Sequence, residues 1–213
     1  ITLENDLVKL ELSTRGGNIK KYYLKAFKNW YAIDIDEGKN FYFENVQLLN
    51  YSKGGDYNLS FVTSDGKAIN TGGLDFVFSG NKNHYKLSND DSLQLSFLLK
   101  VGETKKISKA YTFYGNKYVI NTEVELNGAG SFINNGAIDL VWDNGIRFVE
   151  ENTVDEANYS NASAFYGDEQ VIIDASSVGE VVEKDFSGRV DWIAVRNKYF
   201  AAIISPQNPE MVE

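Results

Sequence analysis

Apolar and polar residues alternate along much of this chain, which is the pattern of strands with one buried face. Residues 93–99 place leucine or phenylalanine at every second position, with Gln94 and Ser96 between them. Residues 8–12 and 118–126 alternate in the same way. Shorter runs of aromatic and β-branched residues suit a pleated surface and predict further strands over residues 41–43, 59–63, 76–78 and 171–173.

Glycine and asparagine pairs separate these runs and predict short connections. Asp65-Gly66 stands between two apolar runs and indicates a hairpin, because glycine accepts the positive φ of a tight turn. Gly16-Gly17 marks another turn. Helical patterning is scarce, and the Asn and Ser content of residues 157–166 favours a loop. The sequence therefore predicts an all-β protein, a sandwich or barrel of antiparallel sheets with little helix.

Composition narrows the classes of function. The chain has 213 residues, a net charge of −9 and no cysteine. We expect one domain over residues 1–213. Disulfides and thiolate chemistry are excluded, and the acidic balance argues against nucleic acid as a partner. It also disfavours docking on anionic lipid, although a local basic patch can escape that average.

The two ends of the chain suggest that it is an excised piece of a longer protein. It opens at Ile1 with no methionine and no signal-peptide pattern. The apolar run from Phe200 to Ile204 is far shorter than the ~20 residues that span a bilayer.

Candidate catalytic and metal-binding residues are few. His84 is the one histidine, its neighbours are polar, and we expect it in an exposed turn. One histidine supplies neither a multi-histidine metal site nor a histidine pair for proton transfer. Residues 34–38 resemble a calcium loop faintly, but glycine stands one position too early, so we interpret them as a solvated acidic turn.

Two carboxylate pairs, Glu150-Glu151 and Asp155-Glu156, follow Trp142, and paired carboxylates with a stacking aromatic can hydrolyse glycosidic bonds. Acidic residues in a loop of an acidic chain are the simpler interpretation. We therefore expect no catalytic residue, no metal and no cofactor.

The stretch DWIAVRNKYFAAIISP, residues 191–206, is the most specific motif in the chain. A Trp precedes small and apolar residues, a basic hinge precedes Tyr-Phe, and an apolar strand ends at proline. This order resembles the closing motif of the periplasmic domain of YidC-type (YidC/Oxa family) membrane protein insertases. The candidate site residues of the motif are Trp192, Arg196, Lys198, Tyr199, Phe200 and Pro206.

Two further stretches are similar to the same family. Residues 2–17 end in Thr14-Arg15-Gly16-Gly17, which resembles a Thr-x-Gly-Gly turn after the first strands, with Gly16 and Gly17 as its key residues. Residues 109–120 resemble the hairpin that joins the two halves of the family's domain. The three matches follow one another in the family's order over nearly the whole chain.

The resemblance implies a β-supersandwich of the galactose mutarotase type. It implies a transmembrane helix before Ile1 and a membrane core after Glu213, with the domain in the periplasm of a Gram-negative bacterium. The implied function is a non-catalytic accessory domain of an inner-membrane insertase, which helps to insert and fold membrane proteins alone or with the Sec translocon. The implied partners are accessory subunits of the Sec translocon and nascent membrane proteins.

Two interpretations of the closing motif stay open. Trp192, Tyr199 and Phe200 fill the core where the last strands meet, or part of the motif is an exposed docking patch with Arg196 and Lys198 on its rim. Two other functions on the same fold also stay open. A mutarotase-like enzyme requires more histidines than His84. A module that binds a peptide or glycan in a cleft can use the candidate stacking residues Tyr22, Tyr23, Trp30, Tyr31 and Trp142.

Overall fold

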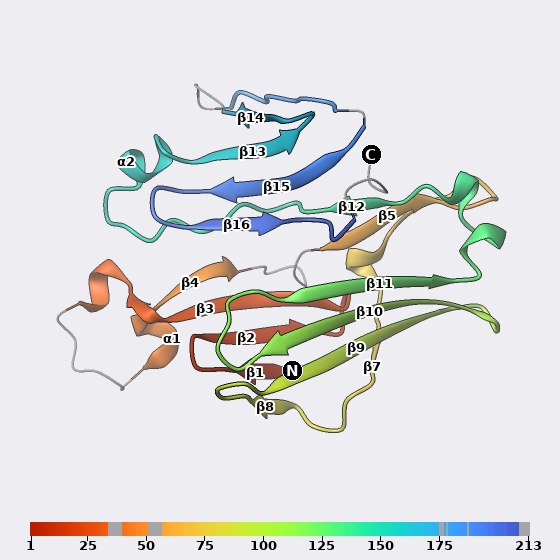
Figure 1. Ribbon diagram of the computed structural model, residues 1–213, viewed down its shortest axis with the longest axis horizontal. Helices are drawn as coiled ribbons and strands as arrows, with labels where there is room; N and C mark the ends of the chain where they lie inside the picture. The colour runs from red at the N-terminus through yellow and green to blue at the C-terminus, as the bar shows by residue number, and fades with distance from the viewer. Residues whose placement is uncertain (34–39, 51–56, 175–176, 178, 187, 209–213) are drawn as a thin grey trace. The chain divides into compact units, whose positions relative to one another are not determined.

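The computed structural model describes residues 1–33, 40–50, 57–174, 177, 179–186 and 188–208 (Figure 1). The chain divides into two compact units, Ile1–Asn144 and Gly145–Glu213. Both units consist mainly of antiparallel β-sheet, which confirms the prediction of an all-β fold. The supersandwich type and the single domain stay predictions.

The described residues of the first unit form three sheets. Their strands pair antiparallel except β1 (Thr2–Glu4) and β8 (His84–Lys86), which pair in parallel. The five-stranded sheet has the order β4-β3-β2-β1-β8, with β1 (Thr2–Glu4), β2 (Val8–Ser13), β3 (Asn18–Lys28), β4 (Asn45–Asn50) and β8 (His84–Lys86). The four-stranded sheet has the order β11-β10-β9-β7, with β7 (Val77–Phe78), β9 (Ser92–Val101), β10 (Lys105–Tyr114) and β11 (Asn121–Asn127). The three-stranded sheet has the order β12-β5-β6, with β5 (Asn58–Val62), β6 (Ala68–Asn70) and β12 (Asp139–Val141).

One antiparallel sheet forms the second unit, in the order β14-β13-β15-β16. Its strands are β13 (Asn161–Tyr166), β14 (Glu169–Ile173), β15 (Val190–Arg196) and β16 (Ala201–Ile204). The helices of both units are short: η1 (Trp30–Ala32), α1 (Phe41–Glu44), η2 (Thr71–Gly73), η3 (Ala129–Ser131), η4 (Asn134–Gly136) and α2 (Thr153–Ala157).

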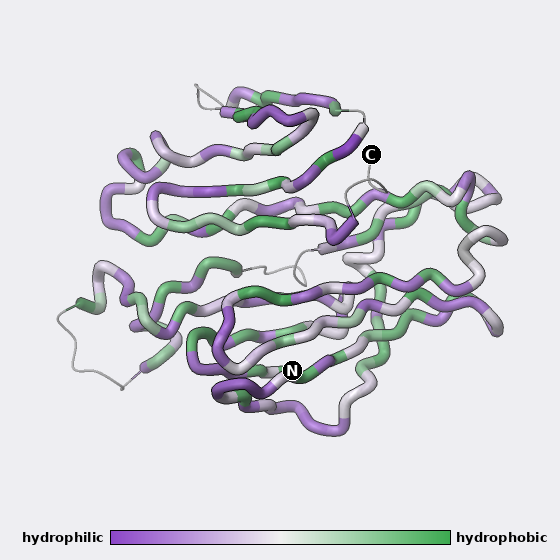
Figure 2. Tube along the Cα trace, in the orientation of Figure 1, coloured by the Kyte–Doolittle hydropathy of each residue, from purple (hydrophilic) through white to green (hydrophobic). Residues whose placement is uncertain are grey.

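The predicted alternating strands β2 and β9 bury one face, whereas β11 alternates only between exposed and half-buried residues. In β9, Leu95 and Phe97 are 3% and 0% exposed, and Ile107 of the neighbouring β10 is 0% exposed. Figure 2 shows the matching alternation of hydrophilic and hydrophobic residues along β9 and β10. The Asp65-Gly66 hairpin is confirmed, since β5 pairs with β6 across it.

Three sequence predictions are wrong in detail. Residues 41–43 form the helical turn α1 instead of a strand, because Glu44 Oε1 accepts a hydrogen bond from the backbone N–H of Asn40 and closes the turn. The strand expected over 118–126 begins only at Asn121. Residues 161–166 form β13 instead of a loop, since they pair with β14 and β15 on either side.

A buried lysine lies at the centre of the first unit. Lys109 of β10 is 0% exposed. Its ammonium donates hydrogen bonds to the carbonyl oxygen of Gly16 at 2.8 Å, to Asn18 Oδ1 at 2.9 Å and to the carbonyl oxygen of Tyr57 at 2.6 Å. All three acceptors are uncharged, so they satisfy the donors without neutralising the charge. Burial lowers the pKa of Lys109 to about 7.

The Gly16-Gly17 turn lies against this lysine. Tyr111, two residues further along β10, donates a hydrogen bond from its hydroxyl to the carbonyl oxygen of Gly17 at 2.7 Å. Both glycines have positive φ, +74° and +61°. A Cβ on Gly17 would lie 3.0 Å from Phe97 Cβ in the core. The turn motif and residues 109–120, which were matched to one family separately, therefore meet in the structure.

Replacement of Lys109 by methionine should lower the unfolding free energy at neutral pH by about 3 kcal/mol, because three buried acceptors lose their donor. Above a pH of about 7 the unfolded chain, whose lysine has a pKa near 10.5, binds more protons than the folded chain. The wild-type unfolding free energy should therefore rise with pH towards about 10, by at most ~1.4 kcal/mol per pH unit. Urea denaturation should show that the deficit of Lys109→Met grows over this range. Lys106→Met, at an exposed position of the same strand, is the control, and an equal deficit at every pH would contradict the prediction.

Gly17→Ala should destabilise the chain by about 3 kcal/mol, since it combines the strain of positive φ with a contact against the core. Gly66→Ala is the matched control, because Gly66 has a φ of +84° but nothing within 4 Å of the added Cβ. It should cost only about 1 kcal/mol. Thermal or urea unfolding of both variants measures the difference, and equal losses would show that packing at Gly17 is unimportant.

Candidate functional site

The closing motif forms the β15–β16 hairpin of the second unit. β15 pairs with β16 from Ile193↔Ile204 to Arg196↔Ala201, and the strand ends two residues before Pro206. The prediction of an apolar strand that stops at proline is confirmed. The four residues between the strands, Asn197 to Phe200, are named here the closing turn.

Asn197 is the buried residue of the closing turn, at 2% exposed. Its Oδ1 accepts hydrogen bonds from the backbone N–H groups of Tyr199 at 3.0 Å and Phe200 at 2.8 Å. Its Nδ2 donates to the carbonyl oxygen of Arg147 at 3.0 Å, and its backbone N–H donates to the carbonyl oxygen of Phe200. One side chain thus fixes the shape of the turn and ties it to the segment before α2.

The aromatic residues of the motif differ from one another in burial. Trp192 is half-buried, and its ring stacks on Phe165 of β13 with centroids 6.0 Å apart. Phe200 is also half-buried. Tyr199 is 50% exposed, so the expectation that it fills the core is wrong. The buried position in the turn is taken by Asn197, whose Oδ1 accepts the backbone N–H of Tyr199.

Charged and aromatic side chains surround the closing turn. Lys198 forms an ion pair with Asp155 of α2 and lies 5.4 Å from the ring centroids of both Tyr159 and Tyr199. The hydrogen bond to Asp155, followed by that to Tyr199, raises the pKa of Lys198 above its ordinary value. Arg196 is exposed at the end of β15. Together, Tyr159, Arg196, Lys198 and Tyr199 are named here the turn patch.

A second buried polar residue positions α2 beside the turn. Glu156 is 0% exposed, and its Oε2 accepts hydrogen bonds from the backbone N–H groups of Val149 at 2.8 Å and Glu150 at 3.0 Å. Asn152 caps the helix through the N–H of Asp155. Two of the four carboxylates considered for glycoside hydrolysis therefore have other partners. Glu156 accepts hydrogen bonds from backbone N–H groups, and Asp155 forms an ion pair with Lys198.

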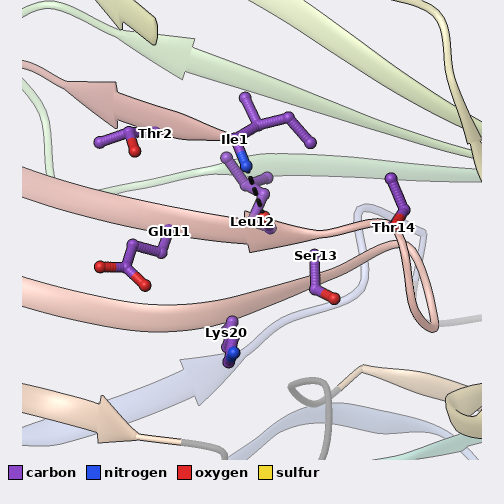
Figure 3. Close-up of a pocket in the computed structure, with 7 residues that line it drawn as sticks. All are labelled: Ile1, Thr2, Glu11, Leu12, Ser13, Thr14 and Lys20. Atoms are coloured by element: carbon purple, nitrogen blue, oxygen red, sulfur yellow. Dashed lines mark hydrogen bonds between the residues drawn. The ribbon is translucent and has the colours of Figure 1, made fainter. Parts of the chain in front are cut away.

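Two depressions among the described residues are lined by residues other than the candidate stacking residues. An open depression of about 370 Å³ is lined by polar and apolar residues of β1, β2 and β3 (Figure 3), namely Ile1, Thr2, Glu11, Leu12, Ser13, Thr14 and Lys20. A second, of about 210 Å³, is lined by residues of β5, β6 and the chain around η4. Tyr23, one of the five candidates, is buried at 3% exposed.

The part of the chain that the structure describes holds no group of three or more metal-ligating side chains. His84 is exposed in β8, an edge strand and not the turn that was expected. The acidic residues 34–38 lie outside the described residues. No described helix has both the length and the hydropathy needed to cross a bilayer.

Fold and site together describe an all-β chain that carries a charged, aromatic turn on its second unit. The family model of the YidC periplasmic domain matches residues 1–212, and the chain belongs to this family. It is similar to proteins named "Membrane protein insertase YidC" from three bacteria: 35% identical over 97% of the chain in Chlorobaculum tepidum, 33% over 97% in Chlorobaculum parvum and 32% over 100% in Chloroherpeton thalassium. The chain spans about one third of the length of these relatives (33%, 33% and 34%).

Asn197→Ala should open the closing turn, because two backbone N–H groups lose their acceptor in a buried site. We expect the unfolding free energy to fall by about 2 kcal/mol and the amides of Tyr199 and Phe200 to exchange hydrogen faster. Hydrogen exchange followed by mass spectrometry measures the second effect. Asn158→Ala, at an exposed position near α2, should change neither, and unchanged protection in Asn197→Ala would contradict the assigned role.

Proposed function

We propose that this chain is a non-catalytic accessory domain of a membrane protein insertase, located on the periplasmic side of the inner membrane of a Gram-negative bacterium. Membership of the YidC periplasmic domain family supports this assignment. The relatives named as insertases are about three times as long as the chain, so insertion itself is assigned to the complete protein. In this role the domain assists the insertion and folding of inner-membrane proteins, alone or with the Sec translocon.

The turn patch is the proposed docking site for accessory subunits of the Sec translocon or for nascent membrane proteins. The observation that carries this proposal is the exposure of Tyr199 and Tyr159, 50% and 49%, around Lys198 on a turn fixed by the buried Asn197. Tyrosine and arginine are the residue types that dominate binding energy at protein interfaces. A turn fixed before binding loses little conformational entropy when a partner docks.

The two rival functions have less support. The two depressions found among the described residues are open and are not lined by Trp30, Tyr31 or Trp142, whereas ligand sites are mostly enclosed and apolar. A mutarotase-like proton transfer requires a base beside a second titratable group in one site. Glu156 is engaged with the backbone N–H groups of Val149 and Glu150.

Site-specific photo-cross-linking in the full-length insertase tests the docking site. A photoreactive residue at Tyr199 or Tyr159 should cross-link to a Sec accessory subunit or to a nascent membrane protein. The same residue at Tyr118, which is 45% exposed in the other unit, is the control. Arg196→Ala should reduce the yield of the cross-link from Tyr159 about tenfold, as for an interface hot spot. Cross-linking no stronger than at Tyr118, in cells that insert membrane proteins normally, would overturn the proposal.

A further inference from the structure

An exposed group of aromatic residues lies on the connection between β3 and β4 in the first unit. Five rings are 40–47% exposed, and Ile33 beside them is 69% exposed. The five residues, named here the aromatic tip, are Phe27, Trp30, Tyr31, Tyr42 and Phe43. Large exposed apolar patches often mark sites that bind a protein, a ligand or a membrane.

Three rings of the aromatic tip contact one another across the connection. Tyr31 of η1 lies 4.8 Å from Phe43 of α1 between ring centroids, and Trp30 lies 5.3 Å from Tyr31. Tyr42, next to Phe43 in α1, packs edge-on against the buried Tyr23 at 5.3 Å. Rings from η1 and α1 are therefore joined, and α1 is anchored in the core through Tyr42. Figure 1 shows α1 beyond the end of β3 and β4.

Buried polar residues hold the base of the aromatic tip. Asn29 is 7% exposed and donates from Nδ2 to the carbonyl oxygens of Phe43 at 2.8 Å and Asn45 at 3.0 Å. Glu44 is 2% exposed and pairs with Lys28 at 3.0 Å. The N–H of Asn29 donates to the carbonyl oxygen of Glu44. This network presents the rings in a fixed arrangement without burying them.

The distribution of charge indicates which surface the aromatic tip can approach. Residues 1–50 contain seven acidic and seven basic residues, so this segment carries no net charge in a chain of −9. The second unit, residues 145–213, contains 13 acidic and 5 basic residues. The Lys9 ammonium lies 4.5 Å from the ring centroid of Tyr42. The first unit as a whole, residues 1–144, contains 17 acidic and 16 basic residues, so the tip belongs to the unit with little net charge.

We propose that the aromatic tip inserts into the headgroup layer of a phospholipid bilayer. Trp and Tyr favour this layer, because their rings are apolar and their N–H or O–H groups stay hydrated. Lysine beside the rings matches the phosphates of the same layer. The location of the domain at a membrane rests on the proposed function, but the contact with lipid is independent of the turn patch. The tip would then fix the height and orientation of the first unit above the membrane.

Depth-dependent quenching by brominated phosphatidylcholine tests the insertion. Trp142→Phe and Trp192→Phe together leave Trp30 as the one tryptophan of the chain. With this variant held on vesicles by a C-terminal histidine tag and nickel-chelating lipid, Trp30 fluorescence should shift to shorter wavelength. Bromines near the headgroups should quench it more than bromines deep in the acyl chains. Trp30 emission that is neither shifted nor quenched in the tethered chain would overturn the proposal.

Vesicle flotation of the untagged chain tests the role of the rings. Trp30→Ser, Tyr31→Ser and Phe43→Ser together should weaken partition into phosphatidylcholine vesicles at least about tenfold. The matched control is Val62→Ser, Tyr118→Ser and Phe148→Ser, with similar exposure of 44–45%, and it should change partition less than twofold. If the triple variant unfolds, Trp30→Ser alone replaces it. This variant leaves the other rings in place and should weaken partition by a smaller factor than the triple variant.

Three results would contradict the lipid contact. Equal partition of the tip variant and the control would show that the rings are not used. Binding only to vesicles that contain phosphatidylglycerol, retained by the tip variant, would assign adhesion to charge instead. Cross-links from Trp30 of the full-length insertase to a protein but not to lipid would assign the tip to a protein partner. The cross-links from the turn patch are measured in a separate experiment. The docking proposal and the lipid proposal can therefore each fail without the other.

Discussion

Lys109 is buried in the first unit, where its ammonium donates hydrogen bonds to oxygens of residues 16, 18 and 57. These residues are far from Lys109 in the sequence. Placing a lysine in an apolar interior is unfavourable unless its donors are satisfied. Here they are satisfied only when the Gly16-Gly17 turn is formed, because both the Gly16 carbonyl and the Asn18 side chain belong to that turn. The lysine therefore couples the sheet that contains β10 to the turn between β2 and β3, and the positive φ of the glycines is needed for the approach.

In the second unit and at the base of the aromatic tip, buried polar side chains also fix irregular segments through hydrogen bonds. Asn197, Glu156, Asn29 and Glu44 are all buried polar residues whose hydrogen bonds go largely to backbone groups of turns and helix ends. Each of them fixes a short irregular segment while the aromatic residues beside it stay exposed. In these segments the polar residue is buried and the neighbouring aromatic residues are exposed, which is the opposite of what is usual for the two residue types. It also explains how the protein presents large rings on defined, rather than flexible, segments.

Periodicity predicted the regular part of the fold because burial of every second side chain leaves its mark within one strand, as in Leu95 and Phe97 of β9. It did not predict α1, where the aromatic run 41–43 favours a strand by propensity but Glu44 closes a helical turn. It could not predict Lys109 or Asn197, since their acceptors and donors are brought together only by the complete fold. The motifs indicated the correct family. They did not predict the exposure of Tyr199, whose backbone N–H is bonded to the Asn197 side chain two residues earlier.

The two exposed aromatic surfaces have different chemistry, which argues for different partners. The turn patch combines two tyrosines with Arg196 and with Lys198, which is paired with Asp155, inside a unit that has 13 acidic and 5 basic residues. Such directional polar groups suit one oriented protein surface. The aromatic tip contains Trp30 and two phenylalanines in a segment without net charge, and it offers rings instead of directional polar groups. Such a surface requires no particular sequence opposite it, only an interface that accepts apolar rings on one side and water on the other. Under the proposed function, one surface would contact lipid and the other would contact protein, so the two differ in chemistry.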